Sequence, residues 1–99
     1  MELTTKQKLY LRNKAHDLKP VVMLGKKGLA DTVIAEIISS VEHHELIKVK
    51  VALEDKEQKD AVAEEIAKLT QTEVVQFIGN NLILFKQAKK KSKFSLPKE

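Results

Sequence analysis

Two lysines stand between two glycines in the tetrapeptide Gly25-Lys26-Lys27-Gly28. The glycines permit a tight turn and a close approach of the backbone to a partner. The lysines place positive charge at the same point. An apolar segment, Val21–Leu24, precedes the loop, and a helical pattern begins at Asp31. Because backbone N–H groups, cations and a helix N-terminus all attract anions, we interpret residues 25–28 as a candidate phosphate-binding loop.

The spacing within this loop restricts what it can bind. A nucleotide P-loop needs four residues between its glycines and a Lys-Ser/Thr pair after them, so residues 25–28 are too short. A Gly-x-x-Gly loop is also used by single-stranded RNA modules to clamp the backbone. The chain has only four aromatic residues, too few for an aromatic RNA-binding sheet. The pattern favours salt-dependent contacts to RNA phosphates, with a plain tight turn as the alternative.

Charge is distributed unevenly along the 99 residues, whose net charge is +4. Basic side chains outnumber acidic ones by seven to two in residues 1–28 and by six to one in residues 86–99, whereas residues 29–85 carry five against eleven. Such a one-sided field attracts polyanions. Besides the loop, we expect RNA contacts from Lys6, Lys8, Arg12, Lys14 and Lys19, although a solvated helix face is the usual role of such residues.

No set of residues indicates catalysis or metal binding. His43 and His44 are adjacent on a predicted helix, so they point about 100° apart and do not converge on a metal. His16 belongs to no motif, no serine has a nucleophile elbow, and there is no cysteine. We therefore predict no catalytic residue, no metal and no cofactor.

The helices are predicted from caps and apolar periodicity. Thr4 and Gln7 have capping-box spacing, and an apolar stripe of Leu11, Ala15 and Leu18 follows, which predicts a helix over 4–18. Isoleucines and Val41 at helical spacing predict a second helix over 31–44, with Asp31 at its start. A third, acidic helix over 55–70 is capped by Asp55 and buries Val62, Ile66 and Leu69.

Strands are expected over 21–24, 46–53, 73–78 and 82–85, the last two joined in a hairpin by Gly79-Asn80-Asn81. Lys48 and Lys50 lie on one face of the second strand, which suggests that this face is open. The predicted fold is α/β and two-layer, a mixed four-stranded sheet with three helices on one face, in the order α-β-α-β-α-β-β.

Length and composition indicate one domain, residues 1–99, with a basic and mobile C-terminal tail from about residue 87. Hydrophobic residues make up 42% and charged residues 32% of the chain, as in ordinary globular proteins. The apolar runs are short and the N-terminus lacks the pattern of a signal peptide. We expect a cytoplasmic monomer without a membrane or small-molecule partner.

Several blocks together resemble a known family. These are Lys19-Pro20-Val21-Val22, the loop Gly25-Lys26-Lys27-Gly28-Leu29, the block His44-Glu45-Leu46-Ile47-Lys48-Val49-Lys50, and Ile78-Gly79 with Leu82 to Lys86. In combination they resemble the CRM domain, and more closely the stand-alone bacterial YhbY-like proteins, over about residues 3–97. The resemblance implies an RNA-binding domain whose fold is similar to the C-terminal domain of translation initiation factor 3.

The resemblance also implies a function and its residues. Stand-alone bacterial members associate with precursors of the large ribosomal subunit, and plant relatives act in organelle intron splicing. By position, the RNA-contacting loop falls on residues 25–28, and Lys48 and Lys50 match a basic pair of the family. This chain has Lys27 where relatives often have Asn, and Ala30 where they often have Thr or Ser, which moves the helix-cap role toward Asp31.

The hypothesis from sequence is therefore a non-enzymatic RNA-binding protein that assists assembly of the large ribosomal subunit. Its partner would be ribosomal RNA in subunit precursors. Two alternatives stay open: a protein–protein adaptor that uses the acidic third helix, and an enzyme acting on a small phosphorylated ligand. The enzyme would need an acid or base near the loop, where only Asp31 is available.

Overall fold

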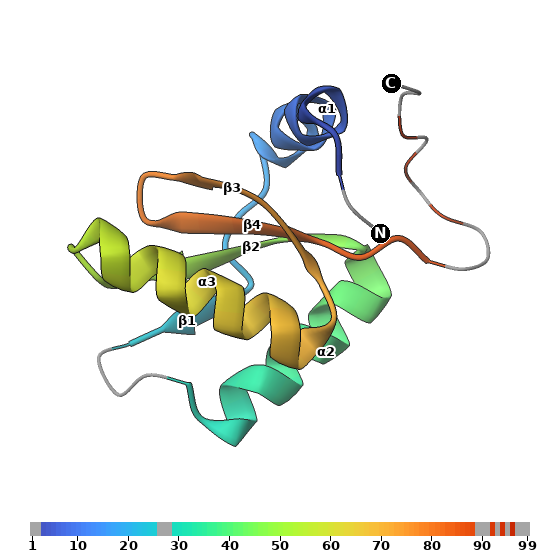
Figure 1. Cartoon of the computed structure of the whole chain (residues 1–99). Helices are drawn as coiled ribbons and strands as arrows, with labels where there is room; N and C mark the ends of the chain where they lie inside the picture. The colour runs from blue at the N-terminus through green and yellow to red at the C-terminus, as the bar shows by residue number, and fades with distance from the viewer. Residues whose placement is uncertain (1–2, 26–28, 89–91, 93, 95, 97–99) are drawn as a thin grey trace.

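The computed structural model of the chain describes residues 3–25, 29–88, 92, 94 and 96. Its elements, in order, are α1 (Thr5–Ala15), β1 (Val22–Leu24), α2 (Asp31–His44), β2 (Leu46–Val51), α3 (Lys56–Thr70), β3 (Glu73–Ile78) and β4 (Asn81–Phe85). The predicted α/β class, element order and mixed four-stranded sheet are confirmed (Figure 1). None of the helices in the described ranges is long and apolar enough to cross a membrane.

The strands are arranged in the order β1-β2-β4-β3. β1 is parallel to β2, as a strand–helix–strand unit predicts, and β4 is antiparallel to both β2 and β3. β2 and β3 therefore run in the same direction but are separated by β4, which returns from the hairpin into the centre of the sheet. As a consequence β1, which leads into the candidate loop, is an edge strand.

The helix caps match the sequence signals closely. Thr4 and Gln7 form the full capping box, with Thr4 Oγ1 accepting from the Gln7 backbone N–H at 3.1 Å. Asp55 caps α3 by accepting the Glu57 backbone N–H at 3.0 Å. At α2 the N-cap is Ala30, which has no side-chain acceptor, and Asp31 is the first helical residue. The predicted cap at Asp31 is thus a first-turn acid instead.

Two apolar residues predicted on buried stripes are exposed. α1 ends at Ala15 instead of continuing to residue 18, because the chain turns with the Leu18 N–H bonded to the Ala15 carbonyl at 3.0 Å. Leu18 is consequently 38% exposed. On α3, Ala63, Ile66 and Thr70 face the sheet, so Leu69 lies off the buried stripe and is 52% exposed.

The main core lies between the sheet and the pair α2 and α3. Ile37 and Val41 of α2 and Ile66 of α3 pack against inward-facing residues of the strands, among them Ile47 and Val49 of β2. The side chains of Ile37, Ile66 and Val49 are fully buried. The apolar side of the alternating pattern in residues 46–53 thus faces α2 and α3, but the predicted two-layer arrangement is wrong, because the other side of the sheet is covered as well.

The prediction that all three helices share one face is wrong. α1 lies on the opposite face from α2 and α3 (Figure 1). Leu11 and Ala15 of α1 pack there in a second cluster with Leu46, Ile83 and Phe85. The lysines of β2 suggested an open face, but Leu46 and the outward residues of β4 provide the apolar strip on which α1 docks. The fold is therefore a sheet with helices on both faces.

Candidate nucleic-acid interface

The segment before the candidate loop is held firmly in the sheet. Val22 and Leu24 are buried on the α2 side, and the Leu24 carbonyl accepts the Ala52 N–H at 3.1 Å. Met23 points to the opposite side and is 63% exposed. The loop therefore starts from a fixed point, at the end of an edge strand whose outward side chains are open to a partner.

Gly25 follows β1 and is exposed. A Cβ atom placed on Gly25 meets no described atom within 4 Å, and its φ angle lies outside the left-handed region. Neither backbone strain nor packing within the described residues accounts for a glycine here. Lys26, Lys27 and Gly28 lie outside the described residues, so the loop remains a prediction from sequence.

The predicted cations of α1 are all exposed but do not gather at one point. Lys6, Lys8, Arg12 and Lys14 lie outside the strip formed by Leu11 and Ala15. Lys8 borders a groove of about 550 Å³ with the α3 acids Asp60 and Glu64. Lys14, in the last turn, places its ammonium 5.5 Å from the centre of the Tyr10 ring.

The β2 lysines lie on the α1 side of the sheet in contrasting environments. Lys50 is exposed and is the register partner of Met23 on β1. Lys48 is only 8% exposed, and its carbonyl accepts the Val21 N–H at 2.9 Å. The sequence predicted a shared face for both lysines but gave no sign that Lys48 is buried.

A cavity of about 400 Å³ brings part of the predicted set together. Lys14 of α1, Lys19 of the following connection and Lys48 of β2 all line it. The remaining lining residues are Leu18, Val21, His44, Leu46, Ile47 and Phe94. No aspartate or glutamate among the described residues lines this cavity. Its positive charge is therefore not neutralised by its own walls.

Phe94 reaches this cavity because the chain after β4 is held against the fold. The buried carboxylate of Glu45 accepts hydrogen bonds from the Ala88 N–H at 3.0 Å and from Ser92 Oγ at 2.6 Å. Phe94 then packs edge-on against Phe85, with ring centres 5.7 Å apart. The mobility of the tail from about residue 87 remains a prediction from sequence. Sequence reasoning did not place Phe94 in the site, because no periodic pattern connects it to β2.

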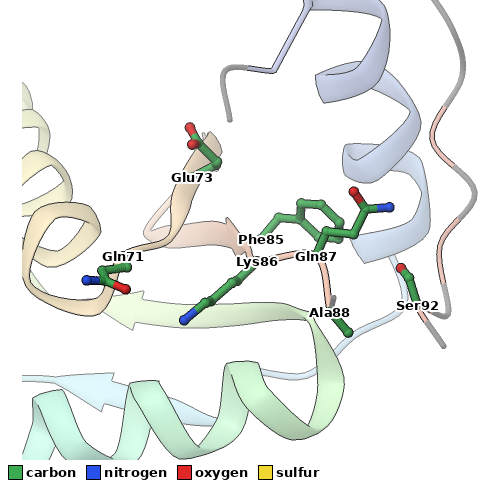
Figure 2. Close-up of a pocket in the computed structure, with 7 residues that line it drawn as sticks. All are labelled: Gln71, Glu73, Phe85, Lys86, Gln87, Ala88 and Ser92. Atoms are coloured by element: carbon green, nitrogen blue, oxygen red, sulfur yellow. The ribbon is translucent and has the colours of Figure 1, made fainter. Parts of the chain in front are cut away.

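A second cavity, of about 530 Å³, differs in character. Its lining residues are Gln71, Glu73, Phe85, Lys86, Gln87, Ala88 and Ser92. Figure 2 shows Lys86 extending toward Gln71 at the end of α3, while Gln87 points the opposite way. With one lysine and one carboxylate on its walls, this cavity lacks the excess positive charge that a phosphate site requires.

The histidines show no arrangement for catalysis. All three are exposed, as expected for surface residues. His43 Nδ1 donates to the Ser39 carbonyl at 2.8 Å, and the His43 and His44 rings are 6.4 Å apart and tilted. Within the described residues no group of three or more metal-binding side chains converges.

The fold defines an α/β domain with a basic cavity, and comparisons with known proteins identify its family. Residues 3–86 match the model of the CRS1 / YhbY (CRM) domain. The chain belongs to this family, as its sequence blocks predicted.

Curated relatives span nearly the same length. A Haemophilus influenzae protein named "RNA-binding protein" is 46% identical over 97 residues, covering 98% of this chain and 97% of the relative. The Bacillus subtilis "Probable RNA-binding protein YqeI" is 43% identical over 95 residues, covering 96% and 99%. The solution structure of the hypothetical protein SAV1595 from Staphylococcus aureus matches with a TM-score of 0.86 and 37% identity, covering 96% and 99% of the two chains.

Proposed function

We propose that this protein binds RNA through the α1 side of its sheet and the adjoining loop at residues 25–28. The observation that carries the proposal is the convergence of Lys14, Lys19 and Lys48, from three separate segments, on one cavity without a described carboxylate in its lining. Such a concentration of cations suits the phosphates of a nucleic acid. The names of the H. influenzae and B. subtilis relatives point to the same ligand.

The loop is proposed as a clamp on the RNA backbone. Three features support this role: the exposed Gly25 has open space around it, β1 is an edge strand, and Ala30 provides no side-chain cap to the first N–H groups of α2. A phosphate near these N–H groups would be favoured by the helix dipole. Lys26 and Lys27 would add charge to the same point.

The biological setting is proposed from the resemblance to stand-alone bacterial CRM proteins. On that basis the RNA is ribosomal RNA in precursors of the large ribosomal subunit, and the protein acts there as a cytoplasmic monomer. No enzymatic step, cofactor or small-molecule substrate forms part of the proposal. Recognition relies mainly on phosphates and shape.

Replacing both loop lysines tests the loop. We expect Lys26→Ala with Lys27→Ala to lower RNA affinity and to flatten the salt dependence by roughly one unit for each lost phosphate contact. The melting temperature should hardly change. The matched control is Lys56→Ala with Lys68→Ala, two exposed lysines of α3. RNA binding that is intact in the loop variant and equal to that of the control would refute the clamp.

A protein–protein adaptor is the second candidate, because α3 exposes an acidic face beside Leu69. Treatment of ribosomal particles with RNase separates the two functions. An RNA-binding protein should leave the particles when the RNA is digested, whereas an adaptor should stay with its protein partner. A Glu64→Gln and Glu65→Gln double variant should weaken association only if the adaptor function is correct.

A further inference from the structure

The most unusual cation in the structure is Lys48. Only 8% of the residue is exposed, and yet it lines the 400 Å³ cavity beside two exposed lysines, Lys14 and Lys19. Along the described part of the chain no fully buried side-chain nitrogen or oxygen lacks a hydrogen-bond partner, so Lys48 is not a sealed, unpaired charge. With Lys14 and Lys19 on the same walls and no carboxylate among the described lining residues, the cavity favours an anionic ligand.

The walls of the cavity indicate what else the ligand contains. Beside the lysines, Leu18, Val21 and Phe94 present apolar surface, and Val21 is 45% exposed. Packing against Phe85 fixes the ring of Phe94. A phosphate ion alone would leave this apolar surface unused. A nucleotide would use both kinds of wall, with its phosphate on the lysines and its base against Phe94.

Two rows of side chains lead from the cavity toward the loop. Parallel pairing of β1 with β2 sets an apolar row, Val21 and Met23, beside a basic row, Lys48 and Lys50. The apolar row ends at Gly25, about 13 Å from Val21 in an extended strand. A single strand lying along these rows can place bases on one and phosphates on the other.

From these observations we propose that the cavity is a nucleotide-binding pocket for single-stranded RNA, and that the strand continues along β1 and β2 to Gly25. The inference rests on the proposed function and adds to it. It assigns Lys48 to a phosphate, Phe94 to a base, and the exposed row of β1 to the path between pocket and loop. It also predicts a preference for single-stranded over double-stranded RNA, since a paired base cannot enter the pocket.

Affinity measurements on the full chain test the pocket, with a short single-stranded RNA of mixed sequence and its duplex as probes. Lys48→Met should lower single-strand affinity roughly tenfold and flatten the salt dependence by about one unit. Its melting temperature should hardly change, because methionine keeps the apolar length of the lysine stem. Lys14→Met, at an exposed position, should have a similar but smaller effect without risk to the fold.

Phe94→Ala tests the base contact separately. It should lower single-strand affinity roughly tenfold while leaving the salt dependence unchanged, since stacking involves no counterion release. The matched control is Leu69→Ala, an exposed apolar residue on α3 that should leave binding as it is.

The outcomes distinguish the pocket from the proposed function. If the unaltered protein binds neither probe, RNA binding itself is refuted. If it binds RNA and the loop variant weakens binding, but Lys48→Met and Phe94→Ala bind like the unaltered protein, only the pocket is refuted. Equal affinity for single strand and duplex would also overturn it. The pocket proposal would also be overturned if a nucleoside monophosphate bound as tightly as the oligonucleotide, because the cavity would then be a site for a small ligand.

Discussion

The two faces of the sheet differ in how completely they are covered. On one face, α2 and α3 enclose a continuous apolar core, and their sequences carry seven acidic side chains against three lysines. On the other face, α1 carries four basic side chains and no acid, and it lies over β2, β4 and β3, which leaves the outward side of β1 open. The first face holds the larger of the two apolar cores, and the second combines a smaller core with a basic cavity.

This difference shows how a small domain can separate stability from binding. A second helix over β1 would bury Val21 and Met23 and close the cavity beside Lys48. A short α1 leaves that part of the sheet available, while Leu11, Ala15 and Phe85 still anchor the helix. Substitutions on the two faces should therefore affect unfolding and RNA binding in different proportions.

The largest effect on stability is expected in the enclosed core. Ile66→Ala removes a fully buried side chain between α3 and the sheet, and it should lower the free energy of unfolding by about 2–5 kcal/mol. Chemical denaturation measures this loss. Leu69→Ala, on the same helix but exposed, should change it by no more than about 0.5 kcal/mol. Similar losses for both variants would contradict the assignment of the buried face.

The next effect concerns Glu45, which lies between α2 and β2 and whose carboxylate binds the C-terminal segment. Glu45→Gln weakens the hydrogen bonds that the carboxylate accepts from Ala88 and Ser92. It should lower the free energy of unfolding by about 1–2 kcal/mol. Because those bonds position Phe94, single-strand RNA affinity should fall as well. Denaturation and RNA titration of the variant measure the two effects. The control is Glu42→Gln, an exposed neighbour on α2, and an equal loss there would argue against a specific anchor.

A matched pair of cap substitutions compares the helices on opposite faces. Thr4→Ala and Asp55→Ala each remove a side-chain cap, and each should destabilise the protein by about 1 kcal/mol. Only the Thr4 variant should also weaken RNA binding, since α1 carries Lys14. Thermal unfolding and RNA titration of both proteins check this. If Asp55→Ala lowered RNA affinity as much, the acidic face would belong to the interface.

The smallest effect on stability is expected at Gly25. Its φ angle and open surroundings accept a Cβ atom, so Gly25→Ala should change the free energy of unfolding by less than about 0.5 kcal/mol while it lowers RNA affinity. Gly79→Ala is the control, because φ is +62° at Gly79 and an alanine there should cost about 1–2 kcal/mol. Unchanged RNA binding by Gly25→Ala would show that no partner approaches the backbone at this position.

Local signals predicted the elements well, and long-range packing explains the errors. The cap residues Thr4 and Asp55 and the isoleucines of α2 act within a few residues of chain, so their helices start where the sequence indicates. Leu18 and Leu69 were assigned to buried stripes by spacing alone, but a turn after Ala15 and the docking angle of α3 leave both exposed. The same holds for the candidate site. The sequence predicted which lysines take part, but it could not predict that Lys14, Lys19 and Lys48 line one cavity.

The elements, the family, the basic ends and the candidate loop could all be predicted from the chain's local patterns, because periodicity, caps and motif spacing are properties of neighbouring residues. Tertiary structure alone decided that α1 covers the opposite face, that β4 enters between β2 and β3, and that Lys48 is buried beside Phe94. Strand alternation shows that a strand has two faces, but it does not show which helix covers each. The placement of α1 resolves that question, and it creates the cavity in doing so.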